Sequence, residues 1–276
     1  MTVELGRYGV WAPHRALTPE LAQEVERLGY GAIWLGVSPG DLSVVDTLLE
    51  ATERITVATG IVNMWQTSPQ DAAAAYHRIE REHPGRFLLG VGIGHPEATA
   101  EYRSPYATMV DYLDRLDAAQ VPLDRCVLAA LGPRALALAA ERTAGAHPYL
   151  VSAAHTRQAR EVLGPDALLA PEHKIVLDTD AAAARAAARP TVANPYLKLR
   201  NYRANLLRLG YTEEDMAGEG SDRLIDALVA HGDAETVAAS LTAHLDAGAD
   251  HVCIQVLPQG TDPRPTLRAL ADALSL

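Results

Sequence analysis

Arg-Phe-Leu-Leu-Gly-Val-Gly-Ile-Gly-His-Pro-Glu, residues 86–97, is the stretch that decides the fold. Its apolar residues form a short run, which is typical of a strand buried on both faces. Side chains alternate along a strand, so the glycines at positions 90, 92 and 94 share one face. Such a face predicts that a flat or bulky group lies against the backbone, or that the strand bends. The strand ends at His95 and Glu97, which can transfer protons, so the pattern predicts a cofactor site here.

Composition excludes several kinds of partner. The chain has 276 residues and a net charge of -11, which argues against binding to the backbone of a nucleic acid. No apolar stretch approaches the roughly 20 residues needed to cross a bilayer, and no basic segment precedes an apolar one at the N-terminus. Cys126 and Cys253 lie in separate apolar runs, as buried reduced thiols do. We therefore expect a cytoplasmic protein that binds neither nucleic acid nor a membrane.

A strand, a helix and a glycine recur along the chain. In the first unit Thr18 is a helix N-cap, Pro19 takes the first helical position and Gly29 follows the helix. Alternating strands and helices with short connections predict an α/β fold, a parallel (βα)8 TIM barrel that forms a single domain over residues 1–276. A short extra helical segment, residues 192–220, is expected after the seventh strand. The strands are expected at residues 5–11, 31–35, 55–63, 87–93, 125–131, 146–151, 173–177 and 250–257.

In a (βα)8 barrel the functional groups follow the carboxyl ends of the strands. After the fifth expected strand, residues 131–134 (Leu-Gly-Pro-Arg) open a helix, and its free N–H groups with the charge of Arg134 make an anion site suited to phosphate. A plain strand-to-helix turn explains the same residues equally well. Gly60, within the third expected strand, indicates a bulge or ordinary barrel packing. His147 follows the sixth strand and is either a structural or a catalytic histidine.

The motifs of several enzyme classes are absent from the sequence. It contains no His-Glu-x-x-His, no Cys-x-x-Cys, no Gly-x-Ser-x-Gly and no Walker-type glycine loop. The glycine run is not a dinucleotide fingerprint, because His95 and Pro96 follow it. A barrel metal hydrolase would need paired His and Asp residues at strand ends, and their spacing here carries no such signature. We therefore expect no catalytic metal.

Six motifs in chain order resemble the luciferase-like flavin and deazaflavin oxidoreductases. The resemblance runs essentially from end to end, and it is closest to the actinobacterial branch that uses coenzyme F420, a deazaflavin that carries hydride. The motifs are residues 29–34, 59–63, 86–92, 131–134, 139–145 and 245–250.

This resemblance implies a luciferase-like barrel whose mouth holds the tricyclic ring of the cofactor. The ring would lie against a bulge at the end of the third strand, where the family often carries a non-prolyl cis peptide, here near residues 59–62. Glycines of the fourth strand would face the ring edge, and residues 131–134 would take the tail phosphate. The cofactor-binding residues implied are Thr59, Gly60, Ile61, Val62, Asn63, Gly92, Gly94, His95, Leu131, Gly132, Pro133 and Arg134.

The chain departs from the family in its acidic and basic groups. Many relatives place an acidic residue and a histidine after the second strand, where this chain has Gly-Val-Ser-Pro at residues 36–39. Relatives often have Glu after the fourth-strand glycines, where His95 stands here. We therefore expect His95 to position the substrate or move its proton, with Glu97 and His147 in support.

The resemblance thus predicts an F420-dependent oxidoreductase that acts on a small organic substrate, and relatives of this kind are often homodimers. The first alternative is an FMN-dependent monooxygenase of the same fold. Two further alternatives belong to other classes: a non-catalytic relative that binds a cofactor, and a barrel lyase that uses Lys174 as a Schiff-base amine.

Overall fold

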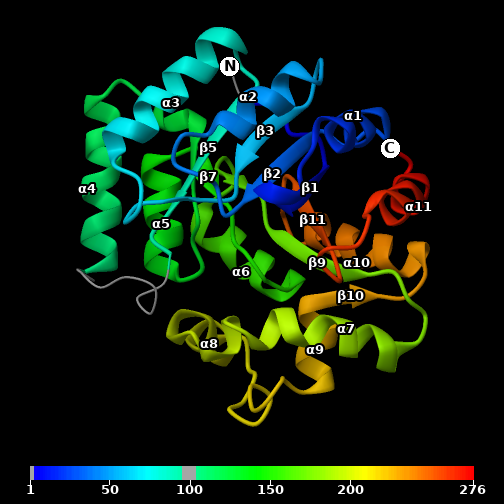
Figure 1. Ribbon diagram of the computed structural model, residues 1–276. Coiled ribbons are helices and arrows are strands. Elements are labelled where there is room, and N and C mark those ends of the chain that lie inside the picture. The colour runs from blue at the N-terminus through cyan, green and yellow to red at the C-terminus, as the bar shows by residue number, and fades with distance from the viewer. Residues whose placement is uncertain (1–2, 95–103) are drawn as a thin grey trace.

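A ring of parallel strands surrounded by helices forms the molecule, as the sequence predicts (Figure 1). The computed structural model describes residues 3–94 and 104–276. The strands are β1 (Tyr8–Pro13), β2 (Ala32–Gly36), β3 (Thr56–Thr59), β4 (Val62–Asn63), β5 (Phe87–Gly92), β6 (Cys126–Leu128), β7 (Gly145–Ala146), β8 (Leu168–Leu169), β9 (Glu172–Val176), β10 (Val229–His231) and β11 (Val252–Val256).

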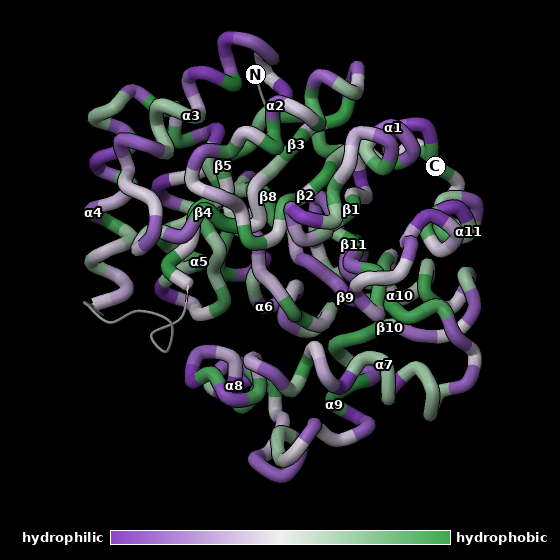
Figure 2. Tube along the Cα trace, viewed as in Figure 1, coloured by the Kyte–Doolittle hydropathy of each residue, from purple (hydrophilic) through white to green (hydrophobic). Residues whose placement is uncertain are grey.

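The helices begin where the sequence offers a capping side chain. Thr18, Ser68 and Ser152 each accept a hydrogen bond from the first turn of the helix that follows. Hydrophobic and hydrophilic residues alternate along α3, as expected of a helix with one buried face (Figure 2). No helix in the described part of the chain is long and apolar enough to span a bilayer. The α-helices are α1 (Pro19–Arg27), α2 (Ser43–Glu50), α3 (Pro69–Glu82), α4 (Pro105–Ala118), α5 (Pro133–Arg142), α6 (Ala153–Leu163), α7 (Ala181–Ala193), α8 (Arg200–Arg208), α9 (Asp222–Leu228), α10 (Ala234–Asp246) and α11 (Arg264–Leu274), and the 3-10 helices are η1 (His14–Ala16), η3 (Leu123–Arg125) and η4 (Tyr196–Lys198).

One extended segment, residues 168–176, closes the ring. Its first part, β8, pairs with β7, and its second part, β9, pairs with β11, which in turn pairs with β1. Glu172 N donates to Pro148 O at 2.8 Å on one side, and Cys253 N donates to Pro171 O at 2.9 Å on the other. Together β8 and β9 therefore act as the seventh strand, which begins at Leu168 and not at residue 173, because the residues before Pro171 already pair with β7.

β10 is a strand that the sequence pattern does not predict. Residues 221–230 are expected to form one helix, but α9 ends at Leu228 and the next three residues pair with β9. Val229 and Ala230 are buried there. The helical expectation is wrong at this end because pairing with a strand distant in sequence outweighs local propensity. β7 pairs with β8, and β10 pairs with β9 on the side away from β11.

Apolar side chains fill three regions. The largest lies between the strands and the surrounding helices. A second packs η4 and α8 against α7 and α9. The barrel interior is a smaller cluster that includes Trp11, Trp34, Leu88 and Cys253. Cys126 and Cys253 are both buried and free, as expected. The interior is thus packed with side chains, as in other (βα)8 barrels.

The third strand is broken, as Gly60 indicates. β3 and β4 each pair with β5, and Thr59 fills the gap, because its Oγ1 accepts from Gly90 N at 2.7 Å and donates to Gly90 O at 2.8 Å. A Cβ on Gly90 would lie 1.8 Å from Thr59 O, so only glycine fits opposite this break. The expected non-prolyl cis peptide near residues 59–62 is wrong: in the described ranges the cis bonds precede Pro195 and Pro258.

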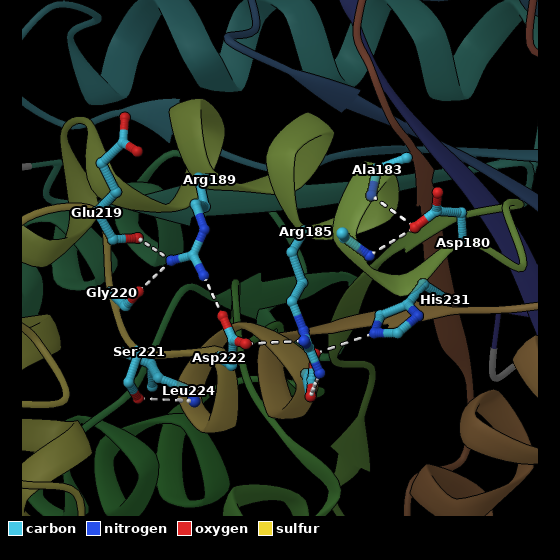
Figure 3. Close-up of polar contacts among 12 residues, drawn as sticks. Asp180, Ala183, Arg185, Arg189, Glu219, Gly220, Ser221, Asp222, Leu224 and His231 are labelled. Carbon is cyan, nitrogen blue, oxygen red and sulfur yellow. Dashed lines mark hydrogen bonds and ion pairs between the residues drawn. The ribbon is translucent and has the colours of Figure 1, made fainter.

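Residues 192–220 contain η4, α8 and turns, between α7 and α9. Figure 3 shows how these two flanking helices are fastened together. Arg185 of α7 contacts Asp222 at 2.8 Å and Asp226 at 2.6 Å, and His231 of β10 contacts Asp226 at 2.9 Å. Arg189 of α7 also pairs with Asp222. The segment therefore leaves and rejoins the barrel at one fixed place.

Replacing Thr59 with Val should destabilise the fold by about 2 to 4 kcal/mol, because both polar backbone groups of Gly90 lose their buried partner. The free energy of unfolding in urea measures this cost. Thr56→Val is the matched control, since Thr56 is also buried but donates a single hydrogen bond, to Glu4 O at 2.8 Å. A cost for Thr59→Val no larger than that of the control would contradict the bridging role.

Candidate functional site

The candidate site is the mouth of the barrel, where the strands end. Every strand pair is parallel, so the loops after β1, β2, β4, β5, β6 and β7 meet at this end. His95 and Glu97, the expected proton-transfer residues, lie outside the described residues. The mouth is therefore built here from the remaining expected residues and their neighbours.

The glycine face of β5 is covered by protein atoms. Thr59 O lies where a side chain of Gly90 would project, and a Cβ on Gly92 would lie 2.6 Å from the side chain of Ile61. Gly94 has a φ of +63° and lies against the side-chain amide of Asn63. The glycines thus make room for the break in the third strand, and Ile61, half-buried, presents its side chain beside them.

Trp11, at the carboxyl end of β1, lies across the neighbouring strand ends. Its indole occupies the space beside Gly36 and Gly60, since a Cβ on either glycine would come within 3.0 Å of the ring. The ring lies 5.2 Å from that of Tyr149, centroid to centroid. The indole Nε1 is buried and has no hydrogen-bond partner among the described residues. Trp11 and Tyr149 thus give the mouth an aromatic side.

Lys174 of β9 is buried beneath Tyr149. Its Nζ donates to Glu172 Oε1 at 2.9 Å, and neither side chain has any exposed surface. Glu172 Oε2 accepts from Leu150 N at 2.8 Å. The Lys174 ammonium lies 3.8 Å from the centroid of the Tyr149 ring and 5.7 Å from that of Tyr196, within cation–π range. Burial lowers the pKa of Lys174, and the charge of Glu172 opposes this shift.

These contacts bear on the Schiff-base alternative. An amine that attacks a carbonyl must meet its substrate, whereas Lys174 is wholly covered. Tyr149 also hydrogen-bonds to Gln255 Oε1 at 2.8 Å and to Tyr196, which closes the space above the ammonium. The structure therefore gives Lys174 a structural role and contradicts the lyase alternative.

His147 lies inside the barrel, below the mouth. Its ring stacks on Trp34 at 4.2 Å, and its Nδ1 is 2.7 Å from Ala170 O. Burial lowers the pKa of His147 to about 4, so the imidazole stays neutral at physiological pH. With 1% of its surface exposed, His147 cannot contact a substrate at the mouth as placed, and the structure does not bring it to the site.

The residues expected to bind phosphate form an open corner. Gly132 is the N-cap of α5, and no side chain caps this helix. Arg134 projects over the ring of Tyr106 at 4.4 Å. Arg208, from α8, brings its Nη2 to 3.8 Å from where a Cβ on Gly132 would be. A free helix N-terminus with two guanidinium groups favours an anion. We call Gly132, Arg134 and Arg208 the anion corner.

Val37 also lies at the mouth of the barrel. It follows β2, its φ is +54°, and its side chain is 73% exposed. A β-branched residue in this region of φ is strained, and such strain clusters at functional sites. Val37 stands where many relatives have the acidic residue and histidine, so this chain presents an apolar side chain there.

Two residues at the mouth were not expected as cofactor-binding or catalytic. Tyr149 follows the short β7, and the pattern offered no signal beyond its place at a strand end. Arg208 lies 74 residues after Arg134 (208 - 134), and no spacing rule connects them.

A cavity of about 530 Å³ lies at the opposite end of the barrel. It is lined by residues at the amino ends of strands, among them Leu5, Leu88, Leu168 and His251. Because (βα)8 enzymes carry their active sites at the carboxyl ends of the strands, this cavity is not the candidate site.

The model of the luciferase-like monooxygenase family matches residues 6–120. A curated relative, 4-hydroxyprotoasukamycin monooxygenase of Streptomyces nodosus subsp. asukaensis, is 29% identical over 123 residues, which are 38% of this chain. The match covers 33% of the length of that relative. The family-model match confirms the resemblance for the part of the chain that holds the motifs at residues 29–34, 59–63 and 86–92.

Solved structures share the fold over nearly the whole chain. An F420-dependent secondary alcohol dehydrogenase in complex with an F420-acetone adduct has a TM-score of 0.75 and 14% identity, covering 99% of each chain. The oxygenating constituent of 3,6-diketocamphane monooxygenase of Pseudomonas putida, in complex with FMN, has a TM-score of 0.70 and 12% identity, covering 96% of each chain. These structures confirm the luciferase-like barrel.

Replacing Lys174 with Met should lower the free energy of unfolding by about 3 to 5 kcal/mol, because it leaves Glu172 buried without its partner. Urea denaturation measures the loss. Adding Glu172→Gln should recover part of it, since a neutral amide needs no counter-charge and can still accept from Leu150 N. A double variant less stable than Lys174→Met would contradict the pairing.

Proposed function

We propose that this luciferase-like chain is an oxidoreductase that uses coenzyme F420 to transfer hydride to or from a small organic substrate. The observation that supports it best is the anion corner, because it lies after β6, at the end of the barrel where such enzymes act. The F420-dependent dehydrogenase of the same fold supports the choice of cofactor. F420, when bound, supplies the hydride carrier.

The anion corner fits a phosphate group. The first N–H groups of α5 have no partner within the helix, and no side chain caps them. Pro133 has no N–H, so Gly132 and Arg134 offer the donors of the first turn. In the described ranges no carboxylate pairs with Arg134 or Arg208, although most ion pairs of the molecule use arginine. Leu131 completes the turn, and its carbonyl is held by His155 Nε2 at 3.0 Å.

The break in the third strand is the second part of the proposed cofactor site. Thr59, Gly60, Ile61, Val62 and Asn63 lie beside the end of β5, where Gly92 and Gly94 complete the contact. Ile61 is the half-buried side chain there, and Asn63 Oδ1 is held by Trp65 N at 2.9 Å. We assign Ile61 and Asn63 to contact the ring, with His95 as a further contact.

The described side chains of the mouth favour a small, largely apolar substrate. Trp11, Ile61, Tyr149 and the exposed Val37 are all apolar or aromatic. A catalytic proton would then come from His95, supported by Glu97. We also infer a cytoplasmic homodimer, as relatives of this kind often are.

An FMN-dependent monooxygenase is the second candidate. The curated relative is a monooxygenase, and one structure with the same fold contains FMN. The anion corner would serve the FMN phosphate equally well, because both cofactors carry one. The two candidates differ in which tricyclic ring binds and in whether oxygen is consumed.

Titration should show F420 binding at least about tenfold more tightly than FMN, which is 1.4 kcal/mol or more of binding free energy. Arg208→Ala should weaken F420 binding by about tenfold, since a charge-assisted contact to phosphate is lost. Fluorescence of the cofactor follows both. The matched control is Arg200→Ala, an exposed arginine on the same helix.

Binding of a deazaflavin that lacks the phosphate distinguishes the loss of a phosphate contact at the anion corner from general damage to the protein. Its binding should not change in Arg208→Ala, because it has no group for that residue to contact. Equal loss for both compounds would mean that α8 itself is disturbed. Tight binding of FMN together with weak binding of F420 would favour the monooxygenase.

Replacing His95 with Ala or Gln should lower turnover by about 100-fold or more, the usual share of a positioned proton donor. Affinity for F420 should fall by less than the about tenfold expected for Arg208→Ala, because His95 is one of several proposed ring contacts. The absorbance of the deazaflavin during turnover of small alcohols and carbonyl compounds measures the rate. His77→Ala, on the surface of α3, is the control. Unchanged turnover in both His95 variants would refute this role, and a wild type that binds F420 but turns over nothing would favour the non-catalytic alternative.

A further inference from the structure

Three side chains able to bind a metal converge on the outside of the barrel. Asp46 lies on α2, Glu82 is the last residue of α3, and His83 follows it as the C-cap. One ligand atom of each lies within 4.8 Å of the other two. Two carboxylates and an imidazole thus lie together where α2 and the end of α3 meet, in the helix layer outside the strands.

Two of these side chains have buried polar atoms that no other group satisfies. Asp46 Oδ1 and His83 Nε2 are both shielded from solvent and have no hydrogen-bond partner in the described part of the chain. Buried polar atoms without partners are costly, and each such case calls for an explanation. A cation shared by these two atoms would satisfy both together.

Arg78 shapes the charge of this cluster. Its Nη2 contacts Asp46 Oδ2 at 2.5 Å and donates to Asp41 O at 3.2 Å. One oxygen of Asp46 is therefore already held, and the side chain is fixed with Oδ1 free. Arg81 Nη2 also lies 3.9 Å from Glu82 Oε1, so two arginines face the two carboxylates and these four charges cancel. A divalent cation would have to compete with both guanidinium groups for the carboxylate oxygens.

We propose that Asp46, Glu82 and His83 bind one divalent transition-metal cation, with Zn2+ as its best probe. One imidazole nitrogen and two carboxylate oxygens match the ligands of Zn2+, whereas Ca2+ and Mg2+ favour oxygen alone. Because one ligand atom of each residue lies within 4.8 Å of the other two, small rotations of the side chains would bring all three to a common ion.

The role of this ion is structural. The ligands lie on helices α2 and α3, whereas active sites of (βα)8 barrels lie at the carboxyl ends of the strands. An ion held by both helices would stabilise the native state in proportion to its concentration. The site is independent of the proposed cofactor, so it stands or falls separately from the proposed function.

Equilibrium dialysis of the full-length protein, first stripped with a chelator, tests the proposal. One Zn2+ per chain should bind with a dissociation constant in the micromolar range, and the melting temperature should rise with Zn2+ concentration. Co2+ in place of Zn2+ should give visible absorption bands that report nitrogen and oxygen ligands. His83→Ala and Asp46→Asn should each weaken Zn2+ binding by about tenfold or more.

Two further variants keep the test decisive. Glu82→Gln removes a ligand from an exposed position, so it should weaken binding without loss of fold. His77→Ala removes another histidine of α3 that lies outside the cluster, and it should bind Zn2+ as the wild type does. Absence of binding in the wild type, or equal binding in the wild type and His83→Ala, would overturn the proposal.

Discussion

The structure depends on the pairing of residues 168–176 with strands on both sides. β9 pairs with β11 on one side and with β10 on the other, and Lys174 is opposite Gln255 and Val229 in these pairings. A residue paired on both sides of a closed ring projects either into the barrel or into the helix layer. Lys174 projects inward, where a charge is costly unless it is paired. Glu172, two residues earlier on the same face, provides that pair.

The same pair fixes the upper part of the barrel. Because the Lys174 ammonium needs more than one partner in this dry environment, the rings of Tyr149 and Tyr196 cover it. Tyr196 belongs to η4, so the barrel interior is linked directly to residues 192–220. Tyr202 of α8 continues the aromatic contact at 4.9 Å from Tyr196. The segment after α7 is therefore anchored at the mouth by a buried charge as well as by surface ion pairs.

Repeated local patterns made the barrel predictable, whereas pairing between residues distant in sequence could not be predicted. Caps such as Thr18 and Ser68 and the run at β5 mark elements within a few residues, and their order fixes the topology. The glycines of β5 indicated that a group lies against their face, but the pattern could not show that Thr59 and Ile61, at the break in the third strand, do so. β10 escaped prediction for the same reason, since a strand of three residues is defined by its partner. The candidate site was predicted where it follows a strand end, as at Gly132, and missed where side chains meet across the fold, as at Arg208 and Tyr149.

The anion corner shows how these constraints combine. α5 alone would offer a helix N-terminus and Arg134, which a simple turn also explains. Arg208 reaches Gly132 only because α8 is held over this side of the barrel, and α8 is held there through Tyr196, Tyr202 and the buried charge of Lys174. A residue with no exposed surface thus governs the position of a cation that a ligand could contact. The segment after α7 thus contributes Arg208 to the anion corner, and its position follows from the packing of the barrel interior.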